Sequence, residues 1–235
     1  MTYTGEVRPG GPSALRALDE LAIRKASVGP YDNNTYLLTC RGSGAQLLVD
    51  APAEPDRLLA LVREGSPTAR LETIVVTHSH GDHHGALSSL VAVTGAAVAA
   101  GVEDAEAITE ATDRRVTRAL RHGEALTFGH VVLEVVGLRG HTPGSIALVY
   151  REPEHATGED AAPGRAHVFT GDSLFPGGVG NTDRDPARFA MLFADVTARL
   201  FEKLGDDTWI YPGHGRDTTL GAERPHLPAW QARGW

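Results

Sequence analysis

Short apolar runs separated by turn residues recur along the chain, and they predict a sheet-based domain. Runs rich in leucine, valine and isoleucine are typical of buried strands. Such runs lie at residues 34–40, 44–51, 71–78, 96–100, 131–138, 145–150, 167–172 and 206–215. Residues 13–25 fit either an edge strand or a short helix, and residues 151–166 are a predicted polar loop rich in glycine, proline and acid.

Helical periodicity occurs in segments between these runs. Helices are predicted over residues 54–65, 82–95 and 185–205, whereas residues 103–122 look helical but have poor periodicity. The segment 185–205 has the clearest pattern, because Asp185 can cap a helix and Pro186 suits its first turn. Its apolar stripe consists of Phe189, Leu192, Phe193, Val196 and Leu200. Strands that alternate with such helices favour an α/β fold class with the helices outside.

No internal repeat or break in composition divides the chain. We therefore expect a single domain over residues 13–221. The Gly/Pro-rich residues 1–12 are expected to form a flexible N-terminus, and residues 222–235 a C-terminal tail. The tail carries Trp230 and Trp235, which could pack on the domain or on a second subunit.

Composition and charge limit the function more than the fold. Of the 235 residues, 41% are hydrophobic and 22% are charged, which is ordinary for a globular protein. The net charge of -8 argues against a mainly electrostatic grip on nucleic acid or on an anionic membrane. The only cysteine, Cys40, lies in a predicted strand, so we expect a buried thiol and no intrachain disulfide.

Two features bear on the compartment. The N-terminal sequence MTYTGEVRPGG lacks the basic start and apolar block of a signal peptide. The longest weakly polar run, Val91 to Val102, is interrupted by glycine and is too short to span a bilayer. We therefore expect a cytoplasmic protein.

Candidate chemistry is concentrated in VVTHSHGDHHG, which directly follows an apolar run. His78 and His80 are two positions apart on an extended segment, so both rings can point the same way. Asp82 and His83 follow where the backbone turns. Neutral imidazoles beside a carboxylate favour a metal, but a metal needs further ligands from elsewhere.

Three later loops could supply those ligands. They are RGHTPGS with His141, FTGDSLF with Asp172 and YPGHG with His214. In each loop the polar residue comes at or just after the end of an apolar strand and is flanked by glycine, which allows close backbone approach. There are enough ligands for two metal ions.

These motifs resemble, in type and in order, those of the metallo-β-lactamase-fold hydrolases, and among them the glyoxalase II branch. The resemblance covers roughly residues 30–220 and rests on THSHGDHHG, GHTPGS, TGDSLF and YPGHG. It implies a four-layer αββα sandwich with the site at one edge of two sheets. It also implies two divalent metal ions, with zinc expected and iron or manganese as alternatives. The implied ligands are His78, His80 and His141 for the first metal, Asp82, His83 and His214 for the second, and Asp172 as the bridge.

The resemblance implies a metal-dependent hydrolase in which hydroxide attacks an activated carbonyl of a small-molecule substrate. Asp82 could both bind a metal and orient the hydroxide. A thioester is the easier substrate, because a thiolate leaves with little help from a proton donor. Two departures leave the substrate open. The C-terminal helical segment that grips glutathione in full-length glyoxalase II is essentially absent here, and Asn181 stands in GNTDR where relatives usually have the arginine of GRTD.

Other functions remain open. A persulfide dioxygenase of the same fold would use one iron on His78, His141 and Asp172. A lactonase, a β-lactamase or a non-catalytic metal-binding protein are further alternatives. His84 fits no ligand position and is expected to support the ligands or to lie at the surface, while Thr142 and Ser173 could bond to a ligand or simply form turns. The basic stretch of Arg114, Arg115, Arg118 and Arg121 could receive an anion, but an exposed helix face is favoured.

Overall fold

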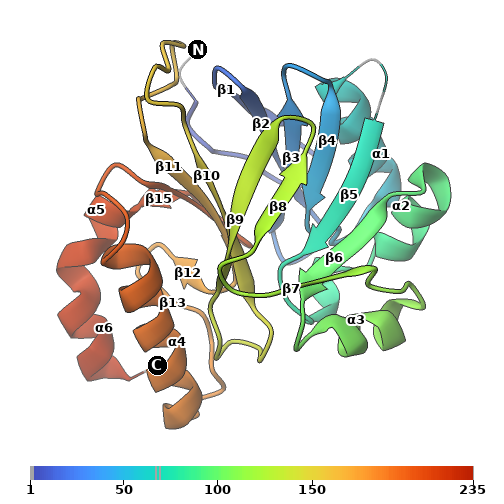
Figure 1. Ribbon diagram of the computed structural model, residues 1–235. Coiled ribbons are helices and arrows are strands. Elements are labelled where there is room, and N and C mark those ends of the chain that lie inside the picture. Colours follow the sequence, from blue (N-terminus) through green and yellow to red (C-terminus); the bar gives the residue numbers. More distant parts are fainter. Residues whose placement is uncertain (1–2, 67, 69, 235) are drawn as a thin grey trace.

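Two β-sheets face each other, and helices cover the outer face of each sheet (Figure 1). The computed structural model describes residues 3–66, 68 and 70–234. This four-layer arrangement is the αββα sandwich that the motif resemblance implied, so the expected α/β fold class is confirmed.

The first sheet contains seven strands in sequence order. They are β1 (Ala14–Ala17), β2 (Leu21–Val28), β3 (Asn33–Cys40), β4 (Ala45–Val49), β5 (Arg70–Val76), β6 (Ala97–Gly101) and β7 (Arg118–Leu120). Strands β1 to β4 pair antiparallel, whereas β4 to β7 run parallel. The helices that follow the parallel strands are α1 (Pro55–Gly65), α2 (Leu87–Thr94) and α3 (Ala105–Thr112).

The second sheet has the strand order β15-β14-β11-β10-β9-β8. Its strands are β8 (Ala125–Phe128), β9 (Val131–Gly137), β10 (Ile146–Arg151), β11 (Ala166–Gly171), β14 (Trp209–Pro212) and β15 (Thr218–Thr219). A small hairpin of β12 (Leu174–Phe175) and β13 (Gly178–Val179) follows β11. The helices on this side are α4 (Pro186–Val196), α5 (Leu220–Glu223) and α6 (Leu227–Arg233) (Figure 1).

Neighbouring residues on the central strands serve different layers of the core. On β3, Leu38 packs between the two sheets, while Leu37 packs against the helices of the first sheet. On β4, Leu47 and Leu48 divide in the same way. Because successive side chains of a strand point to opposite faces, a strand that is covered on both sides must be apolar at every position. This explains why the runs in the sequence are continuous rather than alternating.

Several predicted elements need correction. For residues 13–25 the edge-strand alternative is correct and the helix alternative is wrong, because they form the edge strand β1 and the first part of β2. The helix predicted over 82–95 begins only at Leu87, because residues 81–83 form a 3-10 turn that carries Asp82 and His83. The helical prediction for 103–122 is half wrong. Helix α3 ends where Asp113 takes a left-handed φ of 52°, and the chain then joins the first sheet as β7, so the basic stretch is no helix face. The predicted helix 185–205 continues past α4 only as a π-helical turn over Thr197–Phe201.

The proposed domain limits at residues 12 and 221 stay a prediction. On either side of them, however, Tyr3 and Trp230 are buried, and Trp230 packs edge-on against Phe201. Met1, Thr2 and Trp235 lie outside the described residues. Every helix among the described residues is too short or too polar to cross a membrane. Cys40 is buried with a free thiol, as expected.

A chain of buried polar groups crosses the interior between the sheets. Arg16 donates to the Tyr211 hydroxyl at 2.9 Å, Tyr211 lies 2.9 Å from His167 Nδ1, and His167 Nε2 lies 2.8 Å from Glu152. Arg165 also donates to Glu152. Neutral His167 fits this chain, because its ring can accept from Tyr211 and donate to Glu152. A second proton on the ring would leave the Tyr211 hydroxyl proton without its acceptor in this chain.

Replacing His167 with glutamine is expected to reduce the pH dependence of stability. Burial lowers the pKa of His167 to about 4 despite the neighbouring Glu152. The unfolded chain binds a proton near the ordinary histidine pKa of about 6.5, so stability is full above that pH and falls as the pH drops toward 4. Between about pH 7 and 5 the wild type should lose ~2 kcal/mol more free energy of unfolding than His167→Gln, as measured by urea denaturation. Equal pH slopes in the two proteins would contradict this expectation.

Candidate metal centre

The ends of several strands meet at one edge of the sandwich. Strands β4, β5 and β6 run parallel, so their carboxyl ends share an edge of the first sheet. Strands β9, β11 and β14 point the same way in the second sheet, since β9 and β11 are both antiparallel to β10 and β14 is parallel to β11. An isolated bridge between Asn33 and His214 joins the two sheets there.

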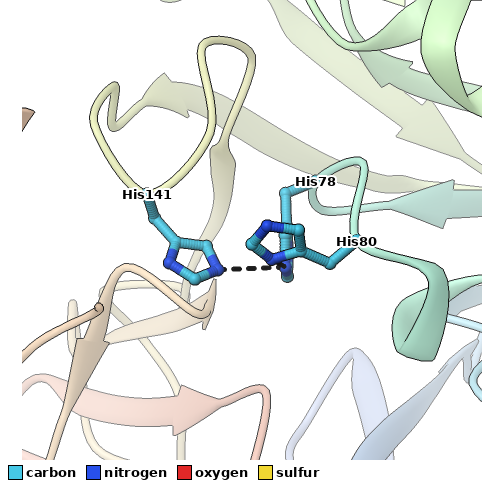
Figure 2. A group of neighbouring side chains, drawn as sticks. All are labelled: His78, His80 and His141. Carbon is cyan, nitrogen blue, oxygen red and sulfur yellow. Dashed lines mark hydrogen bonds between the residues drawn. The ribbon is translucent and has the colours of Figure 1, made fainter. Parts of the chain in front are cut away.

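All seven residues predicted from the motifs come together at this edge. They form three overlapping groups whose candidate ligand atoms lie within 4.8 Å of one another. The groups are His78, His80 and His141; His78, His83 and Asp172; and Asp82, His83 and His214. Figure 2 shows the first group, in which rings from two separate loops turn toward one another.

The ring nitrogens that face inward are close together. His78 Nε2 lies 3.1 Å from His80 Nδ1 and 3.3 Å from His141 Nε2 (Figure 2). In the other half, His83 Nε2 lies 3.2 Å from His214 Nε2. Asp172 is between the halves: its oxygens are 3.7 Å from His141, 3.4 Å from His83 and 3.4 Å from His214.

Hydrogen bonds on the far side of the rings determine which nitrogen carries the proton. His141 Nδ1 lies 2.7 Å from the carbonyl of Asn181, and His214 Nδ1 lies 2.8 Å from the carbonyl of Tyr31. A carbonyl can only accept, so each Nδ1 must donate and each Nε2 presents a lone pair to the centre. His83 is held in the same way, with its Nδ1 2.9 Å from Asp50. Lone pairs that converge at about 3 Å repel one another unless a cation lies among them.

The carboxylates at the centre also favour a bound cation. One oxygen of Asp172 is buried and has no hydrogen-bond partner among the described residues. Burial raises the pKa of Asp172, but the neighbouring His214 and His83 rings outweigh this effect and hold the pKa well below its usual range. Burial lowers the pKa of His78, which keeps that ring neutral. At His83, Asp50 and Asp172 overcome burial and raise the pKa to about 10, so without a cation this ring holds a second proton, which a bound cation would displace. The donor set therefore fits divalent cations.

Glycine is required where the last loop passes the centre. A Cβ on Gly213 would lie 2.1 Å from Asp172 Oδ1 and 2.7 Å from the His83 ring. The PGHG motif therefore keeps space for the carboxylate as well as supplying His214.

Comparison with known proteins agrees with this geometry. The family model described as metallo-beta-lactamase superfamily matches residues 28–214. The chain belongs to this superfamily. Hydroxyacylglutathione hydrolase from Anaeromyxobacter dehalogenans is 35% identical over 185 residues, which cover 78% of this chain and 61% of the relative. The chain thus spans about three fifths of that relative's length.

Two further comparisons cover most of both chains. Hydroxyacylglutathione hydrolase GloC from Haemophilus influenzae is 29% identical over 195 residues, 77% of this chain and 85% of the relative. The crystal structure of TTHA1623 in a di-iron-bound form is 33% identical, covers 84% of this chain and 95% of that one, and gives a TM-score of 0.65. The chain is therefore a metallo-β-lactamase superfamily member of the glyoxalase II-like kind.

Two aspartates that the motifs did not identify hold the ligand loops of this superfamily site. Asp50 follows β4 with a left-handed φ of 60° and accepts hydrogen bonds from the Thr77 amide at 2.7 Å and the Thr77 hydroxyl at 2.9 Å, in addition to its contact with His83. Its signal was present in LLVDAP, since it also ends an apolar run.

Asp104 ties the His78–His80 segment to the His141 loop. Its carboxylate accepts from the Ser79 amide at 2.9 Å, the Gly144 amide at 2.8 Å and the Thr142 hydroxyl at 2.5 Å. Although Asp104 stands at the N-cap position of α3, its side chain makes no capping bond. Thr142 therefore serves this clamp, and nothing in the local sequence signals it.

The remaining polar residues near the centre have different roles. His84 is buried, and its ring contacts the carbonyl of Ser79 at 3.1 Å, so it supports the ligand segment as one of the expectations had it. The Ser173 hydroxyl is buried without a hydrogen-bond partner among the described residues. Asn33, also missed, donates to both the backbone and the carboxylate of Asp82.

Asp104→Asn is expected to weaken metal binding by the His78, His80 and His141 group about 10- to 100-fold, because one amide donor would then face another donor and both loops would loosen. The group around His214, which Asp104 does not touch, should be affected less. Stepwise competition with a chromophoric chelator would measure the two affinities. Asp113→Asn, at the exposed end of the same helix, is the matched control and should behave as wild type. An equal loss at both groups would show a general unfolding effect instead.

Proposed function

We propose that the protein is a dinuclear metal-dependent hydrolase that cleaves a thioester of a small thiol. The observation that carries this proposal is the position of Asp172, a carboxylate between two clusters of inward-facing imidazoles. One such carboxylate can serve two cations at once. The names of the relatives, hydroxyacylglutathione hydrolases, point to the same reaction class.

The residues have separate roles in this proposal. His78, His80 and His141 would hold one cation, Asp82, His83 and His214 the other, and Asp172 both. When bound, the two cations would make water a nucleophile near neutral pH and polarise the substrate carbonyl. Zinc is the metal we propose, and iron is the alternative to test.

Asp82 is the residue placed to orient the attacking water. Its side chain is 34% exposed, so it lies on the open side of the cluster. Burial raises the pKa of Asp82, but the hydrogen bond from Asn33 and the neighbouring His83 lower it by more. The net effect is a lowered pKa, which keeps the carboxylate ionised. Asn33 donates to Oδ2, which leaves Oδ1 to accept a hydrogen bond from water.

The reaction is balanced without any other co-reactant. The water oxygen bonds to the acyl carbon, the carbon–sulfur bond breaks, and the sulfur takes the bonding pair as thiolate. One proton of the water is released to solvent, and the other stays on the carboxylic acid product, which then ionises. A thiolate is stable enough to leave unprotonated, since ordinary thiols have a pKa of about 8.5. An amine leaving group would require a proton donor, so a thioester suits this centre better than an amide.

Elemental analysis of protein purified without added metal, followed by assay on a panel of thioesters, tests the proposal. We expect about two metal ions per chain and hydrolysis of at least one hydroxyacyl thioester. Asp172→Asn should lose at least ~100-fold in kcat/KM and lower the metal content, whereas Asp113→Asn should do neither. One iron per chain together with oxygen uptake on a glutathione persulfide would overturn the proposal in favour of a dioxygenase.

A further inference from the structure

A cavity of about 440 Å³ lies beside the metal centre. Its wall includes Phe175, Val179, Asn181, Arg184 and Arg233. The Phe175 ring in its wall lies 6.5 Å from the His214 ring, and Asn181 holds the His141 ring from the side away from the centre. The cavity therefore lies against loops that carry both halves of the centre, and a substrate whose carbonyl is at the centre could extend into it.

The hairpin of β12 and β13 brings the C-terminal helix to the cavity. A Cβ on Gly178 would lie 2.8 Å from an Arg233 guanidinium nitrogen, and Arg233 donates to the Gly177 carbonyl at 3.3 Å. A Cβ on Gly180 would lie 1.8 Å from the carbonyl of Asp172. The glycines thus allow the loop to pass between the metal centre and α6, and α6 contributes one positive charge to the wall.

The described side chains that line the cavity carry positive but no negative charge. Among the described residues that line it there are two arginines and no carboxylate. Of the two acids adjacent to Arg184 in the sequence, Asp183 is engaged by Arg188 at 2.6 Å and Asp185 accepts from the Ala187 and Arg188 amides. The Arg184 guanidinium makes no hydrogen bond or ion pair with any residue that the structure describes. In a chain of net charge -8, such a wall favours an anionic ligand.

The backbone directs Arg184 to this place. Asp183 and Arg184 both have left-handed φ angles, of 55° and 57°. Non-glycine residues adopt this region at a cost, and two in succession turn the chain sharply before α4 begins. Asp185 then caps α4 through the amides of Ala187 and Arg188. The motif resemblance places an arginine at the position of Asn181, and here the positive charge is three residues further along.

We propose that this cavity binds the thiol part of the substrate and that Arg184 pairs with a carboxylate on it. The inference rests on the proposed function, because it assigns a place to the leaving group of a thioester. Phe175 and Val179 would contact the carbon chain of the thiol. A guanidinium can bind a carboxylate through two parallel hydrogen bonds, which gives orientation as well as affinity.

Two lactoyl thioesters with different thiols provide the kinetic test. One carries glutathione, which is anionic, and the other carries N-acetylcysteamine, which is neutral. The wild type should prefer the glutathione ester, and Arg184→Gln should reduce the ratio of the two kcat/KM values about tenfold, mainly through KM. Arg184→Lys should restore part of the ratio. Arg115→Gln removes the same charge from an exposed position outside the cavity and should leave the ratio unchanged.

Binding of S-propylglutathione, a thioether that cannot be hydrolysed, provides a readout independent of turnover. Calorimetry should show about tenfold weaker binding to Arg184→Gln than to the wild type or Arg115→Gln. If both thioesters are hydrolysed with equal kcat/KM and Arg184→Gln changes neither the ratio nor the binding, this inference is wrong while the proposed function stands. If no thioester is hydrolysed but S-propylglutathione binding still depends on Arg184, the proposed function fails and the anion site remains.

Discussion

Mutual repulsion among inward-facing lone pairs is the constraint on which this site depends. Each of His141, His214 and His83 uses one ring nitrogen to donate to a fixed acceptor, so the other nitrogen faces the centre, where it can offer a lone pair to a cation. The imidazoles are then held about 3 Å apart with carboxylates among them, an arrangement that is unfavourable in an apolar interior unless cations occupy it. The rigid sandwich is what keeps these groups from separating. The fold thus holds a metal site in place before any metal binds.

That rigidity comes from parallel strands and from aspartates that bind loops. Strands β4, β5 and β6 all end at the same edge. Asp50, just after β4, and Asp104, just after β6, both accept hydrogen bonds from the loop that follows β5. Asp104 also accepts from Gly144, in the loop between β9 and β10 of the second sheet, so one carboxylate joins loops of both sheets. Two of the three partners of Asp104 are backbone amides, and hydrogen bonds to the backbone remain possible when side chains in these loops change. This explains how a site of side chains can be positioned by contacts that are mostly to main chain.

The sequence predicted which polar side chains meet at this edge better than it predicted the elements that position them. His78, His141, Asp172 and His214 lie in short motifs whose residue types reflect the metal chemistry directly, so they could be found without knowing the fold. Asp104 could not, because its role arises from loops far apart in the chain. The helix predicted over 103–122 failed for a related reason: pairing with β6 overrode a weak local preference. Continuous apolar runs, by contrast, indicated burial on two faces, so the central strands of both sheets were predicted, whereas the short strands β7, β8 and β15 were not.

Chemistry and selectivity have different structural sources in this molecule. The metal cluster lies at strand ends, largely buried and fixed by hydrogen bonds, so it tolerates little change. The cavity wall is formed by a hairpin of glycines, an exposed turn with Arg184 and a short helix. Such segments can exchange a side chain without disturbing the sheets. An arginine at 184 and asparagine at 181 would then alter which thiol is accepted while the cleavage of its acyl bond stays the same. A hydrolase of this fold can therefore change its substrate through the cavity wall alone, without a change in the metal cluster.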